Sequence, residues 1–238
     1  MTTLTTSLAN RREEFDSHYA LAGALEDRMM LEPDSSLGAV ILSARHINTV
    51  KSGLLIHLYN VEEALMTEAL QLLGNALGLA APRDWTQHSL REWLRESVVS
   101  RISEGGEDGR LDTVVTSSTQ LLTVAALGPQ RLRKPSGTWD DKAIATFMRR
   151  VSMTFTMPGP MWLRIAPQPH YGDVTPLQFL AARRNAIAHG RRSFEDGAND
   201  LRLSDIRVLA DVVLDYLDYV AQAFHTHVDT RSHLIAAA

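Results

Sequence analysis

The strongest constraint on the fold is an apolar stripe in the segment from about Ser36 to Gly78. Residues three and four apart lie on one face of an α-helix, so the stripe predicts a long helix that packs against a core. Gly53 is a point where this helix could be interrupted. The stripe consists of Leu54, Leu58, Val61, Leu65, Ala69 and Leu72.

Two further segments predict helices that could pack with this one. Residues 4–30 combine good helix formers with apolar residues at spacings of three and four. Residues 201–228 carry another apolar face, formed by Ile206, Leu209, Val213, Leu217 and Val220. A chain of 238 residues that is 45% hydrophobic can bury a sizeable core. The sequence therefore predicts an all-α fold, a helical bundle with long antiparallel helices.

The middle of the chain, at about 82–173, is less regular. Asp84 or Thr86 could cap a helix that ends at the glycine-rich stretch SEGGEDG. The following LDTVVTSSTQLLTV could form a strand or a short helix, because threonine and valine favour strands.

A further helix is predicted over residues 140–153, with Thr138 or Asp140 as its cap. Five prolines from Met157 to Pro176 predict an irregular connection. We therefore expect one domain over residues 1–238, with an irregular insertion at about 82–173.

The composition excludes several classes of site. The net charge of -4 gives no overall attraction to a polyanion, so any nucleic acid must be held locally. The chain has no cysteine, which excludes disulfides and thiolate chemistry. No secretion signal and no apolar run of roughly 20 residues is present. We expect a soluble cytoplasmic protein without a membrane segment.

The segment TPLQFLAARRNAIAHG predicts a helix that carries an unusual polar cluster. Thr175 is a suitable N-cap, Pro176 suits the first helical position, and Gly190 suits the end. The cluster of Arg184, Asn185 and His189 then lies on the last turns of this helix.

The spacing within this cluster predicts which side chains can meet. Asn185 and His189 are four residues apart and share one helix face, while Ala186 and Ala188 leave room for a close partner. On a regular helix Arg184 projects about 140° away from His189. Either Arg184 reaches around the helix or the helix loosens near its end.

The arginines beside this cluster predict a local anion site. Arg183, Arg184, Arg191 and Arg192 lie within ten residues. A histidine can transfer a proton near neutral pH, and a guanidinium can hold phosphate oxygens. Such a pair could cleave RNA without a metal, using the ribose 2′-OH as nucleophile. The alternative is structural. Arg184 and Asn185 would then cap neighbouring loops, and His189 would lie at the helix C-terminus because the helix dipole favours it there.

The arginine and histidine spacing alone is not specific. The same spacing occurs from Arg83 to His88, and a version one residue longer occurs from Arg12 to His18. At these two places we expect surface or partly packed histidines.

Three separated segments, in order, resemble the HEPN superfamily, and within it the MAE_28990/MAE_18760-like HEPN proteins. They are VKSGLLIHLYNVEEAL, SGTWDDKAIATFMRRV and LAARRNAIAHG. The resemblance implies an α-helical fold whose two copies pair as a homodimer, bringing two arginine and histidine motifs into one cleft. It also implies a metal-independent endoribonuclease of a toxin-antitoxin, antiviral or other defence system, with an antitoxin or defence-system protein as partner. Transfer RNA is one candidate substrate.

The resemblance also implies roles for particular residues. Arg184 would support the scissile phosphate, Asn185 would orient it or the histidine, and His189 would serve as base or acid. Tyr59, Asn60 and a following glutamate would support the cleft, and we favour Glu63 over Glu62 because it can share a face with Asn60. The alternative for these side chains is an ordinary solvated helix face.

No cofactor and no metal is predicted. His225 and His227 are two residues apart and face different ways on a helix, so with His233 they do not form a ligand set. Two other functions stay open: a non-catalytic HEPN-like module that binds RNA, a nucleotide or a partner protein, and a purely structural subunit.

Overall fold

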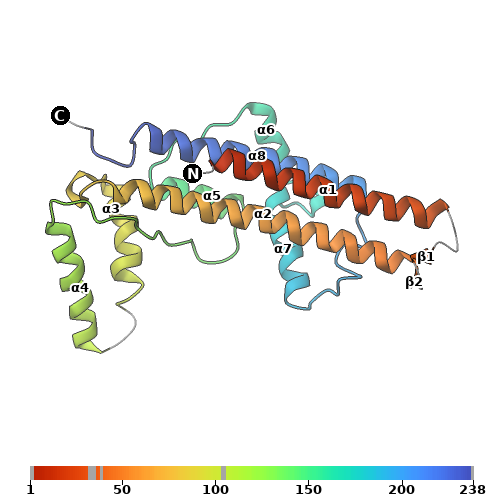
Figure 1. Ribbon diagram of the computed structural model, residues 1–238, viewed down its shortest axis with the longest axis horizontal. Coiled ribbons are helices and arrows are strands. Elements are labelled where there is room, and N and C mark those ends of the chain that lie inside the picture. The colour runs from red at the N-terminus through yellow and green to blue at the C-terminus, as the bar shows by residue number, and fades with distance from the viewer. Residues whose placement is uncertain (1–2, 32–35, 38–39, 103–105, 237–238) are drawn as a thin grey trace. The chain divides into compact units, whose positions relative to one another are not determined.

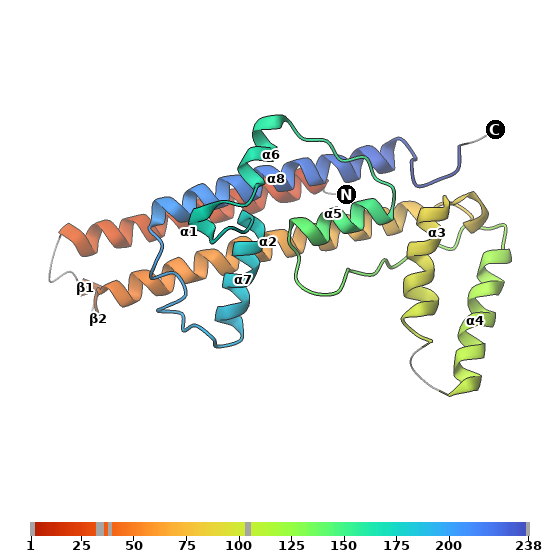
Figure 2. The same cartoon turned by 180° about the vertical axis from the view of Figure 1, so that it is seen from behind.

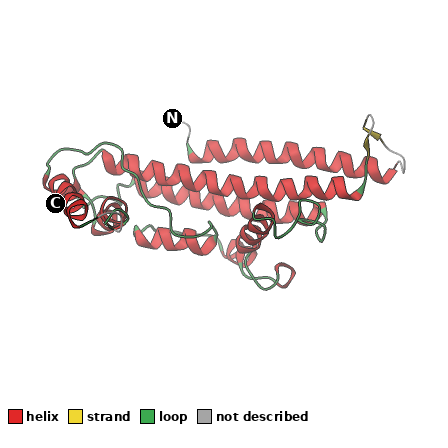
Figure 3. Ribbon diagram, turned by 90° about the horizontal axis from the view of Figure 1, so that it is seen from below, coloured by secondary structure: helices red, strands yellow, loops and turns green. Residues whose placement is uncertain are grey.

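The computed structural model describes residues 3–31, 36–37, 40–102 and 106–236, and nearly all of their regular structure is helical (Figure 3). The strands β1 (Ser36–Leu37) and β2 (Val40–Ile41) form one short antiparallel pair. The α-helices are α1 (Leu4–Leu31), α2 (Ala44–Gly78), α3 (Gln87–Leu94), α4 (Glu107–Leu122), α5 (Asp141–Arg150), α6 (Gly159–Ile165), α7 (Pro176–Ala188) and α8 (Leu203–Asp229). The predicted all-α fold is confirmed.

The chain divides into two compact units. The first comprises residues 1–65, 139–141 and 157–218, and the second comprises 66–138, 142–156 and 219–238. Helices α2 and α8 contribute residues to both units. The predicted single domain with an insertion at about 82–173 stays a prediction.

In the first unit, α1 runs beside α8, as both Figure 1 and Figure 2 show. Ion pairs join the two helices: Arg12 donates to Asp215 over 3.0 Å, and Arg207 donates to Asp16. Beneath them lie fully buried apolar side chains, including Leu8, Phe15, Leu58, Ile206 and Leu209. Helix α7 lies beside α2 (Figure 2), so Arg184 of the predicted polar cluster comes close to Glu63 of α2.

In the second unit, the segment around residues 128–130 lies directly on α2. Backbone N–H groups of Gly128 and Gln130 donate to the carbonyls of Gly78 and Gly74, each over 3.0 Å. A Cβ at Gly78 would lie 1.9 Å from the Gly128 carbonyl oxygen. Only glycine permits this approach, which positions the chain between α4 and α5.

The apolar stripes are confirmed with one change. Every predicted position of the stripes on α2 and α8 is buried except Leu72, which is half-buried, while the adjacent Leu73 is buried instead. The possible interruption at Gly53 is absent, because α2 runs unbroken from Ala44 to Gly78. A glycine costs a helix about 1 kcal/mol, which is less than the burial of Leu54 and Leu55 contributes.

The structure answers two questions that the sequence left open in the middle of the chain: the state of residues 111–124 and the form of the proline-rich connection. The ambiguous segment 111–124 is helical as far as Leu122, within α4, where Glu107 and Asp108 occupy the first turn and favour the helix dipole. The proline-rich connection is more regular than expected. Pro158 and Pro160 lie at the start of α6, where a missing N–H costs no helical hydrogen bond.

Candidate functional site

Helix α7 presents the polar cluster at its C-terminal end. The Thr175 hydroxyl accepts a hydrogen bond from the Gln178 N–H over 3.1 Å, and the Gln178 side chain returns to the Thr175 N–H, which together form a capping box. The helix ends at His189, and Gly190 follows with a φ of 69°. The predicted cap and stop of this helix are confirmed, and His189 is exposed on the final turn.

Arg184 points from α7 to α2. Its guanidinium lies 4.6 Å from the centre of the Tyr59 ring, and one nitrogen is 3.5 Å from a Glu63 carboxylate oxygen. Another nitrogen donates to the Asn185 side-chain oxygen over 3.1 Å. A ring face, a carboxylate and an amide thus hold the guanidinium in one position, with its side chain 27% exposed.

Tyr59 forms a buried support beneath Arg184. Its hydroxyl accepts a hydrogen bond from the Trp139 backbone N–H over 3.2 Å, and the residue is only 1% exposed. Burial, followed by the charge of Glu63, raises the pKa of Tyr59 to about 12. The phenol is therefore neutral near pH 7 and supports the arginine through its ring instead of facing solvent.

The two adjacent glutamates of α2 have different environments. Glu62 is completely buried, whereas Glu63 is partly exposed and faces Arg184. Successive residues on a helix point about 100° apart, so only one of the two can lie beside α7. Asn60 is exposed, on the partly solvated side of α2 that the sequence predicts.

Arg183 has an internal role that the sequence does not predict. Its guanidinium donates to both carboxylate oxygens of Asp200, over 2.6 and 2.9 Å, and to the Gly197 carbonyl over 2.9 Å. It also stacks 4.9 Å from the centre of the Phe179 ring. The hydrogen bonds from Arg183 lower the pKa of Asp200. Arg183 is nearly buried, and its contacts anchor the loop after α7.

Arg191 and Arg192 also differ from each other. Arg191 is exposed, while Arg192 donates to the Asp196 carbonyl over 3.2 Å and lies 3.6 Å from Asp200. The positive charge of the predicted anion site is therefore partly balanced by its own loop. Arg191 is the arginine of this group that extends into solvent.

Arg184 and His189 do not meet within one chain. Among the described residues, no hydrogen bond or ring contact links the two side chains. The helix stays regular as far as the His189 N–H, which donates to the Asn185 carbonyl over 3.1 Å. Arg184 therefore does not reach around the helix to His189, and the helix does not loosen at its end. The Arg184 side chain instead points to α2.

Three residues of the first unit have the spacing of metal ligands: Glu14, His18 and His57 each offer an atom within 4.8 Å of the others. The Nδ1 atoms of the two histidines lie 3.1 Å apart and share a hydrogen bond. His57 is half-buried, and burial lowers its pKa against the opposing effect of Glu14. A neutral imidazole is the form that binds a metal. No local pattern in the sequence marks this group, because its members lie on two helices.

Residues 1–232 match the family of MAE_28990-like HEPN domains. This protein belongs to the HEPN family. HEPN domains are commonly ribonucleases, and the resemblance identified from the three sequence segments is thereby confirmed. No curated protein and no solved structure matches the chain significantly.

Within the described residues, no helix combines the length and the apolar character that crossing a bilayer requires.

Proposed function

We propose that this HEPN protein is a metal-independent endoribonuclease whose reacting groups are Arg184, Asn185 and His189. The observation that carries the proposal is the exposed His189 on the last turn of α7, in a chain that belongs to a family rich in ribonucleases. An exposed imidazole at a helix end can approach a large substrate. Histidine is the side chain that most often acts as general acid or base in catalysis.

The proposed reaction uses the RNA's own 2′-OH. His189 removes the 2′-OH proton, the oxygen attacks the adjacent phosphorus, and the bond from phosphorus to the 5′ oxygen breaks. The leaving 5′ oxygen takes up a proton, and the other product carries a 2′,3′-cyclic phosphate. Arg184 stabilises the negative charge that develops on the phosphate oxygens, and Asn185 orients the histidine or the phosphate.

The contacts of Arg184 support a role in charge stabilisation. Tyr59 and Glu63 fix its guanidinium before substrate arrives, so little reorganisation is needed during the reaction. A phosphate oxygen would compete with Glu63 for the same nitrogen. Arg191, exposed beside the helix end, would contact the RNA backbone.

A homodimer would bring the histidine of one copy near the arginine of the other. Such a dimer would overcome the separation of Arg184 from His189 within one chain. Ala188 is exposed and Ala186 is half-buried on the same turn, so another helix could pack closely there. We expect Ala188→Glu to weaken both dimerisation and cleavage, measured by sedimentation and by RNA cleavage. A variant that stays dimeric would place the interface elsewhere.

The biological setting that we propose is a toxin-antitoxin or antiviral defence system. The substrate would be a cellular or viral RNA, with transfer RNA as one candidate, and a partner protein would restrain the activity. Because the chain carries a net charge of -4, selection of an RNA must depend on local contacts.

The test of the chemistry is a pair of matched oligonucleotides. A ribonucleotide strand should be cut at defined positions, while the same strand with a 2′-deoxy sugar at each cut position should stay intact there. Cleavage of the deoxy-substituted positions would exclude the 2′-OH as nucleophile and contradict the proposal.

A non-catalytic HEPN module is the second candidate, and the observation that favours it is that the contacts of Arg184 among the described residues are with Tyr59, Glu63 and Asn185 and do not include His189. Such a module would bind RNA, a nucleotide or a protein through Arg184 without proton transfer. In that case Arg184→Ala would weaken binding, whereas His189→Ala would leave both binding and any biological effect unchanged.

A further inference from the structure

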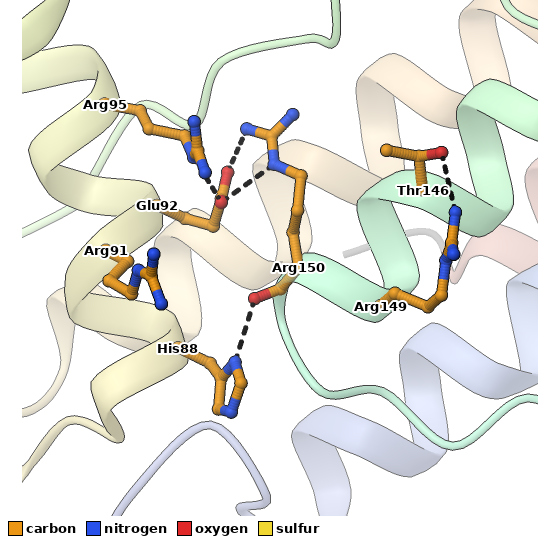
Figure 4. Close-up of a pocket in the computed structure, with 7 residues that line it drawn as sticks. All are labelled: His88, Arg91, Glu92, Arg95, Thr146, Arg149 and Arg150. Carbon is orange, nitrogen blue, oxygen red and sulfur yellow. Dashed lines mark hydrogen bonds and ion pairs between the residues drawn. The ribbon is translucent and has the colours of Figure 1, made fainter.

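A cavity of about 300 Å³ in the second unit is lined mainly by positively charged side chains (Figure 4). It lies between α3 and α5. Arg91 and Arg95 come from α3 and the residue that follows it, and Arg149 and Arg150 come from the end of α5. The one carboxylate in the lining is that of Glu92. Four guanidinium groups against one carboxylate leave an excess of three positive charges around the cavity.

Glu92 fixes two of these arginines in place. Its carboxylate is 1% exposed and accepts hydrogen bonds from Arg95 Nε over 2.8 Å and from Arg150 Nε over 2.8 Å. Arg150 Nη2 donates to the second oxygen of the same carboxylate. Arg150 therefore meets Glu92 through two parallel hydrogen bonds, the geometry in which a guanidinium is most rigidly held.

These two arginines retain donors for a ligand. A guanidinium has five N–H donors, and Arg150 uses its Nε and Nη2 on Glu92 while Arg95 uses its Nε. Figure 4 shows the remaining nitrogen of Arg150 directed away from Glu92. Glu92 orders the guanidinium groups but cannot satisfy all their donors.

Arg91 and Arg149 are not paired with a carboxylate among the described residues. Both are exposed, and Arg149 donates only to neutral oxygens of α5: to Thr146 Oγ1 over 3.2 Å and weakly to the Ala145 carbonyl over 3.4 Å. A structural role in joining α3 to α5 accounts for Glu92, Arg95 and Arg150. It does not account for Arg91 and Arg149.

His88 completes the polar rim of the cavity. Its Nδ1 lies 3.3 Å from the Arg150 backbone carbonyl, so Nδ1 carries the hydrogen and donates to this oxygen. The other ring nitrogen can then accept a hydrogen bond from a protonated phosphate when the ring is neutral, and donate one when the ring is protonated. His88 was expected to be a surface or partly packed residue, and it is exposed. Its contact with Arg150 could not be expected from local sequence, because the two residues are 62 positions apart.

We propose that this cavity binds a ligand with several phosphate groups, such as the triphosphate of a nucleotide or the successive phosphodiesters of an RNA backbone. Several guanidinium groups in one concave site match a ligand with several negative charges, and each planar guanidinium can bind two oxygens of a phosphate. Glu92 is a positioning residue that orders Arg95 and Arg150, and Arg91 and Arg149 bind the ligand. The proposal is independent of the nuclease chemistry at α7.

The first experiment measures binding of inorganic tripolyphosphate to the full chain by calorimetry. Arg91→Ala and Arg149→Ala should each weaken binding about tenfold, since a charge-assisted hydrogen bond contributes enough free energy for that change. Arg110→Ala is the matched control, because Arg110 is an exposed arginine of α4 outside the cavity, and it should leave affinity unchanged. Melting temperatures of all variants verify that each one is folded.

Two results would overturn the proposal: no saturable binding to the wild-type chain, or an equal loss of affinity in Arg110→Ala. Competition then identifies which kind of molecule supplies the phosphate groups. Displacement of tripolyphosphate by a short 2′-O-methyl RNA at lower concentration than by a nucleoside triphosphate assigns the cavity to RNA, and the reverse order assigns it to a nucleotide. Failure of both to displace tripolyphosphate would reject a biological phosphoryl ligand.

The calorimetric test is separate from the test of cleavage. Loss of RNA cleavage in His189→Ala with unchanged tripolyphosphate binding would support both proposals. If neither the wild type nor any variant cleaves RNA, but the wild type binds tripolyphosphate specifically, the nuclease proposal is rejected and the phosphate-site proposal stands.

Discussion

The polar cluster of α7 and the cavity between α3 and α5 use arginine in opposite ways. Around α7, Arg183 and Arg192 meet Asp200, and Arg184 meets Glu63. At the cavity, one buried glutamate contacts only two of the four arginines that line it. Arginine density along a sequence therefore does not measure available positive charge, because nearby acidic residues can neutralise it.

The largest expected effect on stability separates Arg150, which is hydrogen-bonded to Glu92, from Arg149, which has no carboxylate partner among the described residues. Glu92→Ala leaves Arg150, which is largely buried, beside Arg95 with no counter-charge, and we expect a loss of about 3–5 kcal/mol in the free energy of unfolding. Arg149→Ala should cost less than about 1 kcal/mol, because Arg149 is exposed. Chemical denaturation of both variants measures the difference.

A loss below about 1 kcal/mol in Glu92→Ala would show that the buried carboxylate does not hold the cavity together. The contrast drawn between the two regions would then be wrong for the contact of Glu92 with Arg95 and Arg150.

The next effect is expected at α7, where Arg184 should matter more for cleavage than for folding. Arg184→Ala should lower the cleavage rate by about 10²–10³-fold, because a donor to the developing charge is lost. Its partly exposed contact with Glu63 predicts a change in unfolding free energy of at most about 1 kcal/mol. Single-turnover cleavage and thermal unfolding separate the two effects. Equal rates for wild type and variant would remove Arg184 from the reaction.

The loop that holds Arg183 provides a smaller, purely structural test. Gly197 approaches α2 and α7 so closely that a Cβ would lie 2.5 Å from Ser52 Oγ and 2.7 Å from Ile187 Cδ1. We expect Gly197→Ala to destabilise the chain by about 1–3 kcal/mol through overpacking.

Gly23→Ala is the control for Gly197, since nothing lies within 4 Å of the place that an added methyl group would occupy in α1, and helix propensity improves. It should leave stability unchanged or raise it by up to about 1 kcal/mol. Similar losses in both variants, measured by urea denaturation, would contradict the close approach of the loop.

The smallest effect tests whether the Tyr59 hydroxyl takes part in catalysis. Tyr59→Phe removes the acceptor for the Trp139 N–H and should cost about 1 kcal/mol of stability. The ring beneath Arg184 remains, so the cleavage rate should stay within about threefold of wild type. A loss of cleavage as large as that of Arg184→Ala would mean that the hydroxyl itself acts in the reaction.

Local signals in the sequence predicted the parts of the site that depend on neighbouring residues. The Thr175 cap, the stop at Gly190 and the position of His189 follow from short-range helix-end chemistry. The long helices followed from apolar periodicity, and the family followed from three ordered segments. These features needed no knowledge of tertiary contacts.

The partners of the arginines could not be predicted in this way. Arg183 meets Asp200 only because Gly197 lets the intervening loop press against the helices. His88 and Arg150 approach only when α3 packs on α5, and their separation along the chain hides the cavity. Which charge is neutralised and which is available depends on the folded chain.

The most direct test of the proposed nuclease is incubation of the purified chain with total cellular RNA in excess EDTA, beside His189→Ala, followed by analysis of the new RNA ends. We expect the wild type to cut RNA and leave 2′,3′-cyclic phosphate ends, and the variant to be about 10²–10⁴-fold slower. Equal cleavage by the variant, or no cleavage by either protein, would contradict the proposed nuclease.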